Sequence, residues 1–258
     1  KTTDKLKKEI KNYWGITKMD FSFLDKTYLP SFRKSELFTQ YNKYYALTWF
    51  RMAQKCAKIY PVEQYKKENL EELAFSLYEY TNRRNGVRTF LKELNNNGIK
   101  FFVLSHLRKT YIDGASFYDI KNPVLVYTSR YNRIDNFWFT VAHEIAHILL
   151  HTKNKNDFFI DNLEQLNTKV EKKTDSFAAK MLRADEIIKY FKPFSKYISR
   201  IRVIDCAQGL DINKAIVVGV LQHYGMLSRR NLNRFKESVS ELIPDKYWAE
   251  KHLKKIRK

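Results

Sequence analysis

The chain has 258 residues, 44% of them hydrophobic and 15% aromatic, which is enough to bury the core of one large domain or two small ones. Its formal net charge of +20 lies mostly in residues 1–95 and 196–258 and favours an acidic partner, nucleic acid or simply a well-solvated surface. The chain has only two cysteines, without CxxC spacing, which argues against a disulfide scaffold. It has no apolar run of membrane-spanning length and no signal peptide, which argues against a membrane protein. We therefore expect a cytoplasmic protein without a membrane partner.

The first 95 residues are expected to be mainly helical, because apolar residues recur there at helical spacing. A loop rich in Phe and Tyr interrupts the pattern at residues 21–40. The expected helices lie within residues 1–20, 44–60, 69–81 and 86–98.

A small sheet is expected next, because the apolar spacing changes from helical to strand-like. The runs "IKFFVLSHL" (99–107) and "PVLVYTS" (123–129) are rich in β-branched and aromatic residues. Between them, "YIDGASFYD" contains a predicted turn at Asp113–Gly114.

Two long helices are expected to follow the sheet. The first contains "FWFTVAHEIAHILLH" (137–151), and Asn136 is placed to cap it. The second covers residues 168–191. The region 196–258 then begins with a helix, a turn centred on Gly209 and an apolar helix, which resemble a helix-turn-helix in outline but are equally suited to packing on the core.

The first of these two long helices carries three ionisable residues among apolar ones. His143 and His147 are four residues apart, so a helix directs both imidazoles to one point. Glu144 is turned about 100° away, where it can reach a water molecule at a metal without binding the metal. This HExxH arrangement is typical of zinc hydrolases. The alternative, two structural histidines, is disfavoured by the cost of burying three unpartnered ionisable groups, so we expect Zn²⁺ as the cofactor.

A third ligand is expected on the next helix. The metzincin pattern requires Gly and His where this chain has Leu150 and Lys153, whereas Glu171 and Asp175 form the E-x-x-x-D pair of gluzincins. Glu171 would complete the metal site, and Asp175 would accept the remaining ring N–H of His143. Asp175 as the ligand in place of Glu171, or two exposed helix charges, are the alternatives.

This residue set predicts metal-assisted hydrolysis of a carbonyl substrate. Glu144 would take a proton from the attacking water and deliver it to the leaving amine. His223 and Arg130 are candidates for stabilising the oxyanion, with a structural hydrogen bond as the alternative for each. The substrate backbone would pair with a strand edge, for which residues 114–119 and 123–129 are the candidates.

The sequence resembles the ImmA/IrrE family of zinc metallopeptidases. The resemblance rests on "FWFTVAHEIAHILLH", "EKKTDSFAAKML" and "AIVVGVLQHYGMLSRRNLNRFK" and extends from about residue 98 to about residue 238. It implies His143, His147 and Glu171 as ligands and Glu144 as the catalytic base. The sequence departs from the family pattern at Ala146 and at Arg183–Ala184, and the second departure leaves the end of that helix open.

The resemblance implies an α+β fold whose zincin-like peptidase core occupies residues 96–195. A helical region (1–95) would precede this core, and a helical, helix-turn-helix-like element (196–258) would pack on it. It also points to the subgroup in which an XRE-type helix-turn-helix domain is fused before the peptidase, including HigA-like antitoxins. Such a DNA-binding domain would lie before residue 1.

The implied activity is a metalloendopeptidase that cleaves one regulatory protein, either a repressor or a toxin–antitoxin partner. The alternative is a DNA-binding antitoxin or transcription regulator whose zincin domain acts as a sensor or scaffold without proteolysis. DNA would then be contacted mainly through the preceding domain, and a homodimer is compatible with both interpretations.

Overall fold

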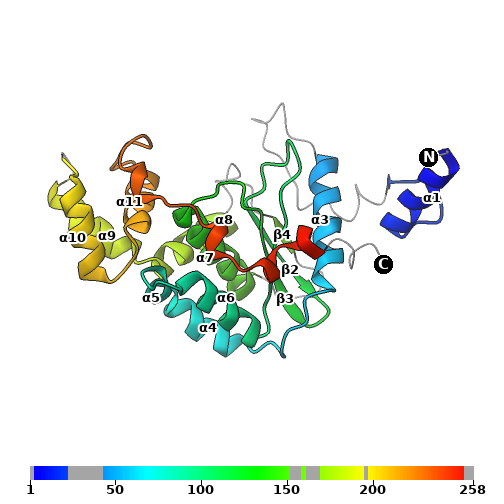
Figure 1. Ribbon diagram of the computed structural model, residues 1–258, viewed down its shortest axis with the longest axis horizontal. Helices are drawn as coiled ribbons and strands as arrows, with labels where there is room; N and C mark the ends of the chain where they lie inside the picture. Colours follow the sequence, from blue (N-terminus) through cyan, green and yellow to red (C-terminus); the bar gives the residue numbers. More distant parts are fainter. Residues whose placement is uncertain (1–2, 23–42, 152–157, 161–168, 195–196, 253–258) are drawn as a thin grey trace.

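The computed structural model describes residues 3–22, 43–151, 158–160, 169–194 and 197–252, and it places one small sheet among many helices (Figure 1). The helices are α1 (Thr3–Trp14), α3 (Lys43–Ala57), α4 (Lys67–Phe75), α5 (Leu77–Thr81), α6 (Gly86–Asn96), α7 (Ile134–Leu150), α8 (Lys169–Met181), α9 (Ala184–Phe191), α10 (Arg200–Leu210) and α11 (Lys214–His223). The strands are β1 (Lys100–Val103), β2 (Gly114–Asp119), β3 (Asn122–Tyr127) and β4 (Phe158–Ile160). The expected α+β class is confirmed. Within the described ranges, no helix has the length and apolar character needed to cross a membrane.

The sheet has the strand order β1-β3-β2-β4. Strand β1 runs parallel to β3, whereas β2 is antiparallel to both β3 and β4. The predicted turn at Asp113–Gly114 is wrong, because Gly114 begins β2 and the β2–β3 hairpin turns at Ile120, which has a φ of 61°. Both predicted edge segments are wrong as well. Residues 123–129 contribute β3 to the sheet interior, and β4 covers β2 at residues 115–117.

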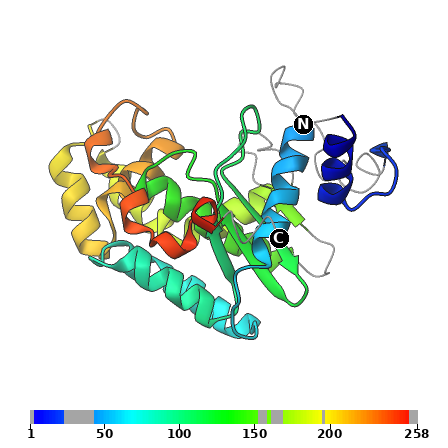
Figure 2. The same ribbon diagram turned by 45° about the vertical axis from the view of Figure 1, so that its right-hand side comes forward.

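Alternate side chains of the strands enter two different apolar layers, as the two-residue period of a strand requires. Phe101 and Tyr127 lie in the layer that contains α7, and Tyr127 packs edge-on against Phe137 at 5.3 Å between ring centroids. Phe102 and Val126 lie in the layer that contains α3. The sheet is therefore covered by α7 on one face and by α3 on the other (Figures 1 and 2).

The N-terminal region is helical as expected, with one interruption. The predicted helix 69–81 is divided into α4 and α5 at Ser76, whose hydroxyl donates to the carbonyl oxygens of Glu72 and Leu73. Most of the predicted loop 21–40 lies outside the described residues. The main core draws on residues from all three predicted regions, and the division at residues 95 and 195 stays a prediction.

Two helix boundaries differ from the sequence-based expectation. Helix α7 begins at Ile134, so Asn136 lies in its first turn and the predicted cap is wrong. The side-chain Oδ1 of Asn136 instead accepts a 3.4 Å hydrogen bond from the Tyr127 hydroxyl. The predicted helix 168–191 is divided into α8 and α9, because Arg183 adopts a left-handed backbone with a φ of 57°. The departure from the family pattern at Arg183 therefore marks a real helix end.

The C-terminal helix pair packs on the core. The predicted turn at Gly209 is wrong, because Gly209 lies within α10 and the chain turns at Asp211, whose φ is 51°. Helix α11 packs against α7 and α9 and buries most of its side chains, which leaves little of it exposed for reading DNA. The chain then returns across the molecule to β1, where Trp248 forms a parallel bridge with Val103 (Figure 2).

Candidate metal centre

Helix α7 buries ionisable groups together with apolar ones. Nearly every side chain from Ile134 to Leu149 is buried, because the helix packs between the sheet and the surrounding helices. The exposed fractions of His143, Glu144 and His147 are 2%, 0% and 1%. Ionisable groups at such positions require partners, so their neighbours define the chemistry of the site.

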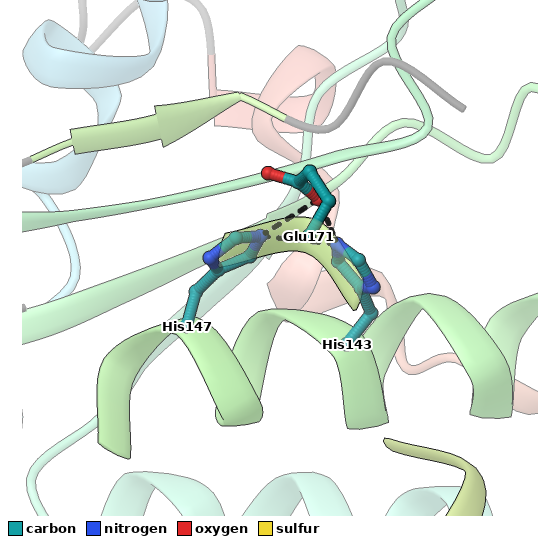
Figure 3. Close-up of side chains that lie close together, drawn as sticks. All are labelled: His143, His147 and Glu171. Carbon is teal, nitrogen blue, oxygen red and sulfur yellow. Dashed lines mark hydrogen bonds and ion pairs between the residues drawn. The ribbon is translucent and has the colours of Figure 1, made fainter. Parts of the chain in front are cut away.

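Three side chains converge on one point, as Figure 3 shows. The Nε2 atoms of His143 and His147 are 3.0 Å apart, and Glu171 Oε2 on α8 lies 3.4 Å and 3.6 Å from them. Tetrahedral zinc holds its ligands at about 2.0–2.2 Å, which separates those ligands by about 3.3–3.6 Å. Both distances to Glu171 fall in this range and the distance between the two imidazoles is slightly shorter. Two imidazoles with one carboxylate are a usual zinc donor set, so these residues fit the metal.

The protonation states suit metal binding. Burial lowers the pKa of His147, which favours the neutral imidazole that a metal requires. Burial opposes the ionisation of Glu171, but its hydrogen bonds with His143 and His147 outweigh burial and lower the pKa of Glu171 to about 2. At neutral pH the site therefore offers an ionised carboxylate beside a neutral imidazole.

Asp175 contacts His143 from the opposite side of its ring. Helical spacing places Asp175 one turn after Glu171 on α8, and its Oδ1 lies 2.9 Å from His143 Nδ1. A carboxylate in this position would hold the Nδ1 proton of a neutral imidazole, and Nε2 would then face His147 and Glu171. The geometry therefore favours Glu171 over Asp175 as the third ligand.

Glu144 lies against the first residue of β2. A Cβ atom built on Gly114 would stand 2.7 Å from Glu144 Oε1 and 2.7 Å from Thr140 Cγ2. Only a glycine lets β2 approach α7 this closely. The sequence-based reasoning treated Gly114 as part of a turn and missed this contact, although a glycine that begins a strand is a recognised sign of close backbone approach.

His223 and Arg130 are not among the three side chains that converge. The His223 ring is 5.7 Å from the Phe139 ring, which is stacked 6.3 Å from His143. Arg130 donates from Nη1 to the Tyr111 carbonyl at 3.0 Å and to Asp113 Oδ1 at 3.3 Å. Each therefore has a structural contact, and a role in stabilising an oxyanion stays a prediction.

Asp113 is a buried carboxyl group that the sequence-based reasoning did not single out. Its side chain is 1% exposed, and burial raises its pKa to about 6 although the Arg130 charge opposes the shift. Its backbone carbonyl accepts hydrogen bonds from Thr128, which tie the start of β2 to the end of β3. Asp113 thus helps to hold Gly114 against α7.

Comparison of the sequence with known protein families agrees with this geometry. Residues 82–205 match the family model Peptidase_M78, described as the IrrE N-terminal-like domain. No curated protein matches the chain. The matched range contains the whole sheet together with α7 and α8, so it includes every residue of the metal centre. Residues 82–205 are therefore similar to the Peptidase_M78 family, a family of zinc peptidases, and they contain the His and Glu side chains that could hold a metal ion.

Proposed function

We propose that this chain is a zinc-dependent metalloendopeptidase that cleaves a specific regulatory protein, either a repressor or a toxin–antitoxin partner. The observation that carries the proposal is the convergence of His143, His147 and Glu171, with Glu144 next to the first ligand on the same helix. The class of substrate follows from the resemblance to the ImmA/IrrE family. DNA binding through a preceding domain and a homodimer stay predictions.

His143 and His147, with Glu171, would hold the metal through two Nε2 atoms and one carboxylate oxygen. In such sites Zn²⁺ polarises the scissile carbonyl and lowers the pKa of water toward neutrality. Asp175 acts behind His143, where its carboxylate holds the imidazole in the tautomer that exposes Nε2. This supporting contact keeps the ligand oriented during turnover.

Glu144 is the proton carrier in this mechanism. Its carboxylate accepts a proton from the attacking water, whose oxygen bonds to the carbonyl carbon. When the C–N bond breaks, the same carboxyl group returns the proton to the leaving nitrogen. Its burial against Gly114 keeps this group in one position, as efficient proton transfer requires.

The experiment separates the ligands from the proton carrier. The parent protein, Glu144→Gln and Glu68→Gln would each be incubated with regulatory proteins encoded by neighbouring genes, and new chain termini would be detected by mass spectrometry. Glu68 is exposed on α4 and provides the matched control. We expect all three proteins to hold about one zinc per chain, and only Glu144→Gln to lose cleavage. Cleavage by Glu144→Gln at the parent rate would refute the mechanism.

A further inference from the structure

A groove of about 550 Å³ lies beside the metal centre, between the start of α7 and the end of α11. Its lining includes Tyr111, Arg130, Tyr131, His223 and Arg229. Phe139 also lines the groove and lies one turn before His143 on the same helix. The mechanism proposed above uses none of the basic residues in this groove.

The groove is continuous with the surroundings of the metal ligands. A smaller pocket of about 230 Å³ shares Phe139 and His223 with it and is also lined by Asp175, which contacts His143. A polypeptide that lies across the metal centre would therefore extend into the groove. Its side chains there would meet the groove's charged residues.

Positive charge dominates the lining. Four cationic side chains line the groove against one carboxylate, Asp135. That carboxylate is already bound by Lys236 at 2.7 Å and by Arg133 at 3.0 Å. No other carboxylate among the lining residues can therefore neutralise Arg130 or Arg229. Among the described residues, the only carboxylate paired with Arg130 is that of Asp113, which does not line the groove.

Contacts with two aromatic rings and two hydrogen-bond acceptors hold the Arg130 guanidinium in one position. Its guanidinium lies between the rings of Tyr111 and Tyr131, at 5.1 Å and 4.9 Å from their centroids. The guanidinium donates both of its hydrogen bonds, to Tyr111 and Asp113, from Nη1. Within the described part of the chain, Nε and Nη2 stay available as the two parallel donors that match a carboxylate.

Arg229 supplies a second cation to the same groove. It is exposed, and it has no ion pair among the residues that the structure describes. Its charge is close enough to Lys236 to help burial lower the pKa of that lysine. An anionic ligand would relieve this repulsion between cations.

We propose that the groove is a substrate subsite for a carboxylate, which a polypeptide lying across the metal centre presents to Arg130 and Arg229. The carboxylate is that of an Asp or Glu side chain or that of the C-terminus. This inference rests on the proposed function, because it names the chemistry of the substrate next to the same site. It gives the regulatory partner a recognisable feature, an acidic group at a fixed distance from the cleaved bond.

The test measures binding, so that it is independent of cleavage. Three pools of short fluorescent peptides would be titrated against Glu144→Gln. The first has a fixed Asp or Glu and an amidated C-terminus, so its carboxylate is on a side chain. The second has Asn or Gln in that position and an amidated C-terminus, and the third has Asn or Gln and a free C-terminal carboxylate. The same titrations would use proteins that also carry Arg229→Gln, Arg130→Lys or the control Arg88→Gln. Arg88 is exposed on α6 outside the groove and has the same charge. A single-stranded oligonucleotide would serve as the competing polyanion.

We expect one of the carboxylate pools to bind about tenfold more tightly than the amide pool, a difference of about 1.4 kcal/mol, because hydrogen bonds between charged groups are stronger than those to neutral groups. The tighter pool identifies the source of the carboxylate. Arg229→Gln and Arg130→Lys should each reduce the preference, whereas Arg88→Gln should keep it. Any of four results would overturn the inference. All pools could bind equally, no pool could bind, or the preference could be unaffected by the groove variants. The fourth is that the oligonucleotide binds more tightly than the peptides and depends on the same groove residues. Zinc content and the loss of cleavage in Glu144→Gln would test the proposed function separately.

Discussion

Asp175 Oδ1 lies 2.9 Å from His143 Nδ1, on the side of the imidazole opposite the Nε2 atom that faces Glu171. A carboxylate in this position orients a metal-binding histidine and raises its basicity. We expect Asp175→Ala to weaken zinc binding by about 10–100-fold without unfolding the protein, because Asp175 is partly exposed. Competition with a chromogenic zinc chelator measures the change. Asp185→Ala, on the exposed side of α9, is the control, and parent-like affinity in Asp175→Ala would contradict the assignment.

Gly114→Ala is predicted to destabilise the protein and to impair catalysis. The added methyl group would stand 2.7 Å from both Glu144 Oε1 and Thr140 Cγ2, so either β2 or α7 must shift. Overpacking of this kind costs about 1–3 kcal/mol of the free energy of unfolding. Urea denaturation and cleavage assays report the two effects.

Gly209→Ala is the matched control for that substitution. Gly209 lies in α10 with open space at its Cβ position, so alanine there should raise the free energy of unfolding by about 0.5–1 kcal/mol. Opposite signs for the two glycine variants are expected. A neutral or stabilising Gly114→Ala would show that the approach of β2 to Glu144 is looser than described.

The buried carboxyl of Asp113 should make stability depend on pH. Burial raises its folded-state pKa to about 6, above its usual value, so the folded protein holds this proton more tightly than the unfolded chain. Its contribution to stability is therefore full below about pH 4 and is lost as the pH rises through about 6. The loss amounts to at most about 3 kcal/mol.

Asp113→Asn removes this titration and so isolates it. Denaturant unfolding of parent and variant at about pH 4 and about pH 7 should show the variant gaining stability relative to the parent as the pH rises. Other titrating groups are common to both proteins and cancel in the difference. A difference that stays constant with pH would contradict the raised pKa.

Lys236 should matter more to stability than a lysine in an exposed ion pair. Its side chain is 3% exposed, and its Nζ lies 2.7 Å from Asp135 and donates at 2.7 Å to Gln222. Lys236→Met leaves Arg133 on Asp135, so we expect a loss of about 1–3 kcal/mol in the free energy of unfolding.

Lys251→Met is the matched comparison. Its 2.6 Å pair with Asp245 is solvent-exposed on both sides, and such pairs contribute less than about 1 kcal/mol. Chemical denaturation measures both variants. Equal losses would mean that the buried network around Asp135 does not stabilise the start of α7.

The convergence of the three candidate metal ligands could be predicted because it depends on local geometry. One helix places His143 and His147 on a common face, and the same i, i+4 spacing on α8 brings both Glu171 and Asp175 close to His143. The amphipathic helices and the change to strand-like spacing after residue 95 also follow from short-range periodicity. The sequence therefore predicted well the type of each helix or strand and the face on which its side chains lie.

Features that depend on contacts between elements were missed. Gly209 looked like a turn, yet the chain turns at Asp211, and Arg183 interrupts a helix with a left-handed backbone that nothing in its local sequence predicts. Asp113–Gly114 has the composition of a turn, but its glycine serves the packing of β2 on Glu144. The prediction that β2 forms an edge of the sheet was wrong because β4 pairs with it. Strand β4 is short and follows α7 in the sequence, so it could not be recognised from the residues near β2.

The most direct test of the central claim is the zinc content of the purified protein, measured by elemental analysis for the parent, Glu171→Gln and the exposed control Glu68→Gln. The account predicts about one zinc per chain in the parent and the control, and a strong loss in Glu171→Gln, because the third ligand of a tetrahedral site would be gone. A parent protein that holds no zinc even after reconstitution, or a Glu171→Gln variant that holds it as tightly as the parent, would contradict the account.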